Sequence, residues 1–299
     1  MLRTRVLTAA VLAPLTVAVV VLGEPWFSLF IGVVAFLALV ELVSLLDAAG
    51  YEPPQVLTIL TGLALTGAGL AVTNDESVGG ALASLLDALD PPGLVTATLI
   101  ASVLVLAAGG FTRSEPRAGF ATWAMSSFGV VYVGVLLPTV SIVAHLAPPG
   151  GSAATAVGPF GLPSGLAWAA TLLLVVWGYD TGAYLTGRWL GRRHLVDHIS
   201  PSKTVEGLAG GLVVGTIGAG VGCALIGLDA WHPLLIGPIV GLAAQAGDLA
   251  ESLLKRSAGR KESGFVVPGY GGVLDRIDSF LFAAPVLAGY ALLVAGRVA

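Results

Sequence analysis

Long apolar runs separated by short polar joints dominate the hydrophobic pattern of this chain. Runs of about 18 or more residues with few charges recur along it, and a helix of that length crosses about 30 Å of hydrocarbon at about 1.5 Å per residue. The pattern predicts nine membrane spans, near residues 6–23, 26–47, 55–73, 94–111, 119–144, 165–187, 207–228, 233–255 and 278–296. The predicted fold is therefore an all-α, polytopic integral membrane protein.

Glycine and proline mark the joints between these runs. Pro53-Pro54, Pro91-Pro92-Gly93 and Pro148-Pro149-Gly150-Gly151 are places where helices should end. The chain also has 41 glycines, many of them inside the apolar runs. Small residues let helix backbones approach closely where lipid supplies no hydrophobic force for association. We therefore expect glycines at the helix contacts.

Composition excludes an ordinary soluble domain. Hydrophobic residues make up 56% of the 299 residues and charged residues only 11%, whereas soluble domains carry about 25% charged residues. The mean hydropathy is +0.92. A formal net charge of −4 indicates neither a nucleic-acid partner nor a disordered acidic tail. The positions of the charges are therefore more informative than their sum.

The basic residues predict an orientation in the membrane. Nine spans put the two chain ends on opposite sides, and cytoplasmic loops are enriched in Lys and Arg. With the N-terminus in the cytoplasm and the C-terminus outside, the cytoplasmic segments contain every Lys and Arg except Arg297. The outer segments 74–90 and 147–161 contain none. Span count and charge bias thus agree.

The charges also predict two functional regions. Residues 1–160 have few ionisable groups in or beside the spans, so we expect structural, lipid-facing helices that contribute to a dimer or a lipid groove. Residues 161–299 hold most of the basic residues and a cluster of carboxylates near the same membrane face. This second region is predicted to be catalytic, with cytoplasmic loops at 188–206 and 255–277.

The richest stretch for chemistry runs from Gly247 to Ser279. Helical spacing puts four polar residues on one face: Asp248, Glu251, Ser252 and Lys255. Asp275 and Asp278 follow, three residues apart, after a basic and glycine-rich loop that contains Arg256, Arg260, Lys261, Tyr270, Gly271 and Gly272. Carboxylates hold Mg²⁺ together with substrate phosphates, cations neutralise the phosphates, and glycines let backbone N–H groups approach. The stretch predicts a site for a metal-bound polyphosphate.

A structural alternative remains for several of these residues. Juxtamembrane cations such as Arg260 and Arg276 can bind lipid headgroups and pair with nearby carboxylates. An ionisable group inside a span costs about 2.5–3.5 kcal/mol on insertion scales, which favours a functional role for Asp248 and Asp275. Glu251 is either a site residue or a partner of Lys255. Glu41, in the second span, is either part of a buried structural pair or the rim of a lipid groove.

A second polar stretch, Trp177–Arg188, contains Asp180 and leads to the start of the next span. Hydroxyls and a lysine precede that start: Ser200, Ser202, Lys203 and Thr204. This combination at a helix N-terminus suits an anion. The alternatives are simple helix capping, and pairing of Asp180 with Arg188 or Lys203.

Together these residues resemble the phosphatidate cytidylyltransferase (CDP-diacylglycerol synthase) family. Its C-terminal signature has a Ser, a Lys-Arg, a Lys-Asp and then Pro-x-His-Gly-Gly-x-x-Asp-Arg-x-Asp. The same spacing is found here in Ser252, Lys255-Arg256, Lys261-Glu262, Pro268-Gly269-Tyr270-Gly271-Gly272 and Asp275-Arg276-Ile277-Asp278. Two positions depart from the signature, since Glu262 replaces an Asp and Tyr270 a His. The loss of an imidazole at position 270 puts any proton-transfer role there in doubt.

The resemblance implies that CTP and phosphatidic acid are the substrates, and that both meet at the cytoplasmic edge of a prokaryotic plasma (inner) membrane. It assigns Asp248 and Asp275 to Mg²⁺, with or without a second cation, and Asp278 to the metal or its surroundings. The CTP phosphates would be bound by Lys255, Arg256, Lys261 and Arg276. The lipid phosphate or the nucleotide would be held by Ser200, Ser202, Lys203 and Thr204, and the substrate site would be completed by Asp180, Tyr270, Gly271 and Gly272. It also implies a homodimer.

Two other functions remain open from the sequence. A CTP-dependent lipid kinase, of the polyprenol or phytol type, would transfer the γ-phosphate of CTP to an alcohol. An ion-coupled transporter would also place ionisable groups inside spans. The carboxylates here gather near one membrane face, whereas carriers usually place their sites near the midplane.

Overall fold

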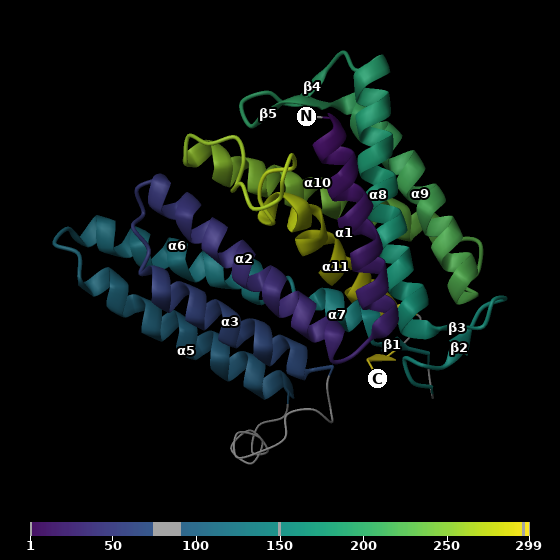
Figure 1. Ribbon diagram of the computed structural model, residues 1–299, viewed down its shortest axis with the longest axis horizontal. Coiled ribbons are helices and arrows are strands. Elements are labelled where there is room, and N and C mark those ends of the chain that lie inside the picture. Colours follow the sequence, from purple (N-terminus) through teal and green to yellow (C-terminus); the bar gives the residue numbers. More distant parts are fainter. Residues whose placement is uncertain (1, 74–90, 149–150, 295–296, 299) are drawn as a thin grey trace. The chain divides into compact units, whose positions relative to one another are not determined.

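The computed structural model describes residues 2–73, 91–148, 151–294 and 297–298 (Figure 1). Its helices are α1 (Leu2–Leu22), α2 (Trp26–Ala48), α3 (Gln55–Ala71), α5 (Pro91–Phe111), α6 (Pro116–Gly134), α7 (Thr139–Ala144), α8 (Ser164–Leu190), α9 (Val205–Ile226), α10 (Pro233–Ser257) and α11 (Leu274–Val294). Three short antiparallel strand pairs accompany them: β1 (Leu146–Ala147) with β6 (Arg297–Val298), β2 (Ala156–Val157) with β3 (Leu162–Pro163), and β4 (His194–Val196) with β5 (Ser200–Thr204). The regular structure is thus mainly helical, as predicted, with three short strand pairs that the all-α prediction did not include.

Seven helical segments in the described ranges are long and apolar enough to cross a membrane: Trp26–Ala48, Pro91–Phe111, Pro116–Ala144, Ser164–Leu190, Val205–Ile226, Pro233–Ser257 and Leu274–Leu293. Two shorter apolar helices, Ala10–Leu22 and Gln55–Ala71, coincide with the remaining two predicted windows. The polytopic helical fold is therefore confirmed. The count of nine spans and the orientation of the chain ends stay predictions.

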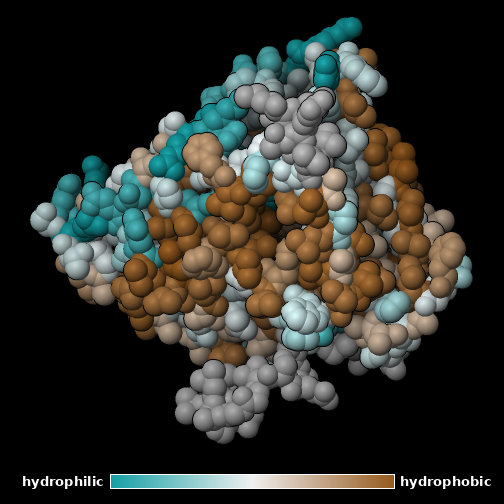
Figure 2. All heavy atoms as spheres, viewed as in Figure 1, coloured by the Kyte–Doolittle hydropathy of each residue, from teal (hydrophilic) through white to brown (hydrophobic). Residues whose placement is uncertain are grey.

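Large apolar side chains are exposed on the outer faces of the helices. On α2, for example, Leu29 is 60% exposed and Val33 50%, and on α5 Leu104 is 66% exposed. Figure 2 shows hydrophobic residues gathered over much of the visible surface. Extensive apolar exposure is unfavourable in water but suits contact with lipid chains, because a bilayer core is as apolar as these side chains.

The chain forms two compact units. The first contains residues 1–141 and 254–276, and the second contains residues 142–253 and 277–299. The loop between α10 and α11 therefore groups with the N-terminal helices and not with the helices that precede it in sequence. The predicted functional division at residue 160 stays a prediction, since the compact units follow a different boundary.

In the first unit, α2 carries a wide buried face around Leu39 and Leu42, both 0% exposed. α5 and α6 touch where Gly110 meets Gly119: a Cβ atom on Gly110 would lie 2.6 Å from the Gly119 carbonyl oxygen. Thr122 of α6 donates a hydrogen bond to the Tyr51 carbonyl at 2.7 Å, which ties α6 to the segment after α2. The Thr122 contact ties α6 to the segment that follows α2, the helix that carries Glu41.

In the second unit, α8 and α9 pack along a row of glycines. A Cβ atom on Gly211 would lie 2.7 Å from the Tyr179 ring, and one on Gly218 would lie 2.5 Å from the Leu174 carbonyl oxygen. Side chains at these positions would push the helices apart. The glycines therefore permit the close packing that the composition predicts.

The segment before α9 differs from the prediction of a simple helix start. Ser200–Thr204 forms β5, which pairs with β4 so that Thr204 lies opposite His194. α9 then begins at Val205, and the Thr204 hydroxyl accepts a hydrogen bond from Gly207 N at 3.0 Å. The capping role is thus confirmed, while the hairpin was not expected because Pro201 and its polar neighbours are untypical of a strand.

Candidate active site

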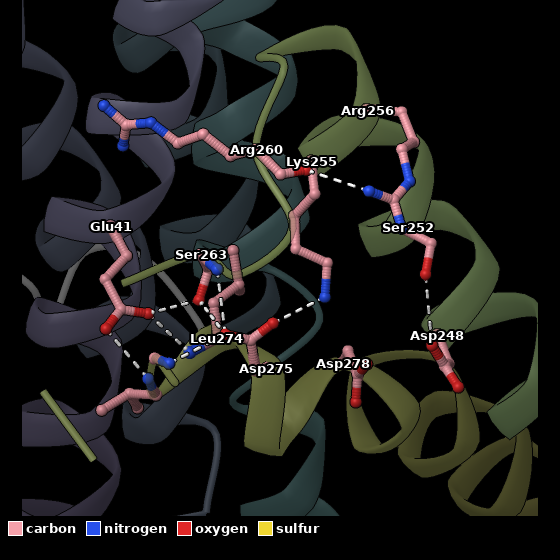
Figure 3. Close-up of polar contacts among 12 residues, drawn as sticks. Glu41, Asp248, Ser252, Lys255, Arg256, Arg260, Ser263, Leu274, Asp275 and Asp278 are labelled. Carbon is pink, nitrogen blue, oxygen red and sulfur yellow. Dashed lines mark hydrogen bonds and ion pairs between the residues drawn. The ribbon is translucent and has the colours of Figure 1, made fainter. Parts of the chain in front are cut away.

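Asp275, the second residue of α11, lies in a buried hydrogen-bond network of the first unit (Figure 3). Lys255 Nζ, near the end of α10, is 2.6 Å from Asp275 Oδ1. Asp275 Oδ2 accepts hydrogen bonds from Ser263 N at 2.9 Å, Ser263 Oγ at 2.9 Å and Gly272 N at 2.8 Å. The side chains of Asp275 and Lys255 are only 5% and 12% exposed. Both carboxylate oxygens therefore have protein partners in a site shielded from solvent.

A second carboxylate, Glu41 of α2, completes this network and is only 4% exposed. Glu41 Oε1 accepts a hydrogen bond from Val273 N, and Oε2 accepts hydrogen bonds from Leu274 N and Ser263 Oγ, each at 2.9 Å. The Ser263 hydroxyl thus lies between two carboxylates, as Figure 3 shows. We call Glu41, Lys255, Ser263, Asp275 and the backbone amides of residues 272–274 the carboxylate network.

Glycine is required where the loop meets this network. A Cβ atom on Gly272 would lie 2.0 Å from Ser263 Oγ and 2.3 Å from Glu41 Oε2. Gly271 has a φ of +86°, a conformation that other residues rarely adopt. The glycines of the loop were predicted to let backbone N–H groups approach a phosphate. In the structure, Gly272 N instead donates to the Asp275 carboxylate.

Three arginines in and beside the α10–α11 loop are exposed and make local contacts: Arg256 of α10, Arg260 of the loop and Arg276 of α11. The guanidinium of Arg276 lies over the Tyr270 ring, 5.2 Å from its centroid. Arg256 donates to the Arg260 carbonyl at 3.4 Å, and Arg260 donates to the Ser44 hydroxyl of α2 at 3.0 Å. The exposure of these guanidinium groups leaves them accessible to an anionic ligand.

A cavity of about 650 Å³ opens beside the carboxylate network. It is lined by Val40, Glu41, Ser44 and residues 260–265, and its volume falls in the range of small-molecule sites. Lys261, which was predicted to bind the CTP phosphates, lies on this cavity together with Glu262. The cavity therefore adjoins the α10–α11 loop and one carboxylate of the network, that of Glu41.

Asp248 of α10 is the centre of a second polar group, in the second unit. Asp248 Oδ2 is 2.6 Å from Lys203 Nζ of β5, and Oδ1 accepts a hydrogen bond from Ser252 Oγ at 3.4 Å (Figure 3). The Asp248 side chain is 35% exposed and that of Lys203 16%. Lys203, from the predicted anion-binding stretch before α9, thus pairs with Asp248, one of the predicted metal ligands. Asp248 is more exposed than Asp275.

α11 approaches α10 directly beside Asp248. A Cβ atom on Gly247 would lie 2.3 Å from the Asp278 carbonyl oxygen, so the two backbones touch there. Asp278 Oδ1 accepts a hydrogen bond from Ser279 N at 2.7 Å. Gly247 therefore brings the turns that carry Asp248 and Asp278 together within the second unit.

The other predicted substrate residues of the second unit differ in accessibility. Asp180 is exposed on α8, Ser202 is exposed on β5, and Ser200 is buried. Arg188, one of the two cations proposed as a partner of Asp180, donates to the Tyr184 hydroxyl at 2.8 Å. The other, Lys203, is ion-paired with Asp248. Asp180 and Ser202 are thus accessible to a ligand, and their substrate roles stay predictions.

The predicted magnesium ligands offer the hard oxygen donors that Mg²⁺ prefers. Within the described ranges, no group of three or more His, Cys, Asp or Glu side chains is arranged to hold a metal ion. Both oxygens of Asp275 and both oxygens of Asp248 have protein partners, but Asp248 is the more exposed of the two, and one or two carboxylates commonly bind Mg²⁺ together with substrate phosphates. The three-carboxylate magnesium site stays a prediction.

Two members of the carboxylate network were not assigned to the site from the sequence. Glu41 was predicted to be either a buried structural partner or the rim of a lipid groove, and its hydrogen bonds support the first. The isolated acidic residue in an apolar span was the signal for it. Ser263 had no distinguishing sequence signal beyond its place in the polar loop.

Comparison with known proteins agrees with this combination of residues. The chain matches the Cytidylyltransferase family over residues 3–294. A phosphatidate cytidylyltransferase of Synechocystis sp. is 32% identical over 304 residues, which cover 97% of this chain and 96% of the relative. Over shorter stretches the identity is higher. A phosphatidate cytidylyltransferase of Staphylococcus haemolyticus is 46% identical over 125 residues, which cover 41% of this chain and 48% of the relative. One of Bacillus subtilis is 45% identical over 125 residues, which cover 41% of this chain and 46% of the relative. Since the family match extends over nearly the whole chain, this protein belongs to the cytidylyltransferase family.

Proposed function

We propose that this protein transfers the cytidylyl group of CTP to phosphatidic acid, forming CDP-diacylglycerol and releasing pyrophosphate. The observation that carries the proposal is the match to a relative of that name along nearly the full length of both chains. The lysines and arginines around Asp248 and Asp275 support it, because the reaction brings two polyanions together. The apolar helices support it too, since the acceptor lipid stays in the bilayer.

The reaction needs little acid–base chemistry from the protein. A phosphomonoester has a second pKa of about 6, so the phosphate of phosphatidic acid is already an anionic nucleophile near neutral pH. One of its oxygens forms a bond to the α-phosphorus of CTP, and the bond from that phosphorus to the pyrophosphate oxygen breaks. The protein has to hold the two anions together and stabilise charge on the leaving pyrophosphate.

The residues near each carboxylate have distinct parts in this proposal. The CTP phosphates are bound by Lys255, Lys261, Arg256 and Arg276. The lipid phosphate or the nucleotide is bound by Lys203 together with the hydroxyls of β5. Asp248 would hold Mg²⁺, with Asp275 and Asp278 as the other assigned carboxylates. When bound, the ion neutralises phosphate charge and polarises the phosphoryl oxygens.

The fate of a single phosphorus atom tests this function. We expect purified protein supplied with phosphatidic acid and Mg²⁺ to incorporate label from [α-³²P]CTP into a chloroform-soluble product. Label from [γ-³²P]CTP should leave in pyrophosphate, and ATP should support little incorporation. Thin-layer chromatography of the organic phase provides the measurement.

The same assay distinguishes the other two functions. A lipid kinase would put the γ-label into the lipid and would prefer an alcohol acceptor such as a polyprenol, because the alcohol becomes phosphorylated. A transporter would incorporate neither label with any acceptor. Either result would reject the cytidylyl-transfer proposal.

We also propose nine spans, a cytoplasmic N-terminus and an external C-terminus, with the site on the cytoplasmic side of a prokaryotic plasma membrane. The distribution of Lys and Arg supports this orientation. Because CTP is made in the cytoplasm, the basic loops would then face the nucleotide. A homodimer, implied by the family resemblance, is part of the same proposal.

Reporter fusions test the orientation. A reporter that is active only in the cytoplasm should give a signal when fused after Arg117 or after Arg193, and none when fused after Ala299. A second reporter that is active only outside should give the opposite pattern. A cytoplasmic signal at Ala299 would remove one span or reverse the proposed arrangement.

A further inference from the structure

We propose that Glu41 is a positioning residue for this reaction, which holds the start of α11 and the Asp275 carboxylate in their working geometry. The inference rests on the proposed function, and it adds a residue from the second helix to a site otherwise carried by the C-terminal half of the sequence. The juxtaposition that supports it is the carboxylate network of the first unit, where Glu41 meets residues more than 220 positions later in the chain.

Glu41 caps the N-terminus of α11 from a distant helix. The first amides of a helix have no partner within the helix, and a carboxylate there also interacts favourably with the helix dipole. Glu41 accepts hydrogen bonds from Val273 N and Leu274 N, both at 2.9 Å. Val273 and Leu274 are 9% and 0% exposed, so water has little access to replace this partner. The capped turn is the one that carries Asp275.

Ser263 connects the two carboxylates. Its hydroxyl oxygen is 2.9 Å from both Glu41 Oε2 and Asp275 Oδ2. A hydroxyl has a single hydrogen and two acceptor lone pairs, so it donates to one carboxylate at a time. Ser263 N also donates to Asp275 at 2.9 Å. The loop residue that orients Asp275 is therefore itself held by Glu41.

Two glycine backbones pack closely against the carboxylate of Glu41. Cβ atoms on Gly264 and Gly272 would lie 2.6 Å and 2.3 Å from its oxygens. Glu41 lines the cavity beside Lys261, but its oxygens accept from protein donors, and a carboxylate repels the phosphates of either substrate. Its effect on the reaction must therefore pass through Ser263, Asp275 and the start of α11.

Glu41→Gln is the sharpest substitution because it keeps the side-chain volume but removes one acceptor. Two amides and one hydroxyl donate to the carboxylate of Glu41. If the glutamine carbonyl accepts from Leu274 N and Ser263 Oγ, its NH₂ group faces the N–H of Val273, and one donor loses its partner. Glu41→Asp keeps both oxygens on a shorter side chain and should recover part of the lost function.

The experiment measures kcat and KM for both substrates in Glu41→Gln, Glu41→Asp and a matched control, Glu115→Gln. Glu115 is an exposed glutamate of the same unit whose side chain makes no capping hydrogen bond. We expect Glu41→Gln to lower kcat by about 10- to 100-fold, as loss of a supporting hydrogen-bond partner commonly does. KM for CTP and for phosphatidic acid should change by less than about 3-fold, because binding contacts remain. The control should match wild type.

A double-mutant cycle with Ser263→Ala tests the route through Ser263. If Glu41 acts through this hydroxyl, the combined Glu41→Gln/Ser263→Ala protein should lose less activity than the product of the two single losses. Fully multiplicative losses, or a Glu41→Gln protein with unchanged kcat and only a lower Tm, would overturn the positioning role.

Hydrogen exchange tests the contact without relying on activity. In wild-type protein the amides of Val273 and Leu274 should be protected, and Glu41→Gln should speed exchange of Val273 while amides in the middle of α2 stay unchanged. Rapid exchange of both amides in wild type would reject the cap, even if Glu41→Gln did not fold. Wild-type protein that is inactive with CTP and phosphatidic acid, but protected at these amides, would instead reject the proposed function and leave the cap intact.

Discussion

Asp275→Asn should lower turnover by about 1,000-fold, the upper range for removing one preorganised electrostatic group, and should also destabilise the protein. Asparagine has only one acceptor oxygen. If that oxygen accepts the three hydrogen bonds that Asp275 Oδ2 accepts in the wild type, the NH₂ group faces the Lys255 ammonium. Lys255 is only 12% exposed, and leaving a buried charge without its partner costs about 3–5 kcal/mol. Initial rates with CTP and phosphatidic acid, together with Tm in detergent, provide the measurements.

The control for this variant is Asp47→Asn, an exposed aspartate on α2 of the same unit. It should retain wild-type activity and Tm. A second comparison tests how much of the lost Tm comes from the unpaired charge: Lys255→Met combined with Asp275→Asn removes both charges. We expect the double variant to recover part of the lost Tm but little activity. Restored turnover in the double variant would show that Asp275 serves only as a counter-ion of Lys255.

Asp248→Asn should also lower turnover strongly, with a smaller loss of stability than Asp275→Asn. The Asp248 side chain is 35% exposed, against 5% for Asp275, so water screens its ion pair more. Because its partner Lys203 is only 16% exposed, we still expect Tm to fall, but by less than in Asp275→Asn. Turnover should fall by about 100- to 1,000-fold, because a carboxylate assigned to the nucleotide's metal loses its charge. Rates measured over a range of Mg²⁺ concentrations should show a weaker metal dependence.

Two further variants make this result specific. Asp229→Asn changes an exposed aspartate of the same unit, between α9 and α10, and should be silent. Ser252→Ala removes only the 3.4 Å contact to Asp248 and should reduce turnover less than Asp248→Asn does. Wild-type rates and an unchanged Mg²⁺ response in Asp248→Asn would reject its assignment as a metal ligand.

The helices could be predicted from the sequence because their signal is local. Each of the nine apolar windows overlaps a helix in the described part of the chain, and Thr204 caps α9 as its position indicates. The β4–β5 hairpin was missed because its residues, with Pro201 among them, lack the alternation that marks a strand. Short pairs of strands at helix ends depend on tertiary position more than on propensity.

The site was predictable as a set of residues but not as a set of pairs. Helical spacing placed Lys255 on a face with Asp248 and Ser252, and the structure pairs it with Asp275 across the loop. Lys203 was one of two alternative partners considered for Asp180, and the structure pairs it with Asp248. Chemical type and spacing identify candidates, whereas pairing depends on how distant segments meet, for which a single sequence carries no direct signal.

The distance along the chain between Glu41 and its partners has a consequence for biosynthesis. The Ser263 hydroxyl is made 222 residues after Glu41, which takes roughly 10–45 s at the usual rates of synthesis. During that interval α2 carries a carboxylate in an apolar segment before any of its three final donors exists. Until then, the Glu41 carboxylate must be solvated by water or bound by a temporary partner. Glu41→Leu should therefore insert more readily than wild type while lacking the completed site, so that efficient membrane insertion and a working active site make opposing demands on this position.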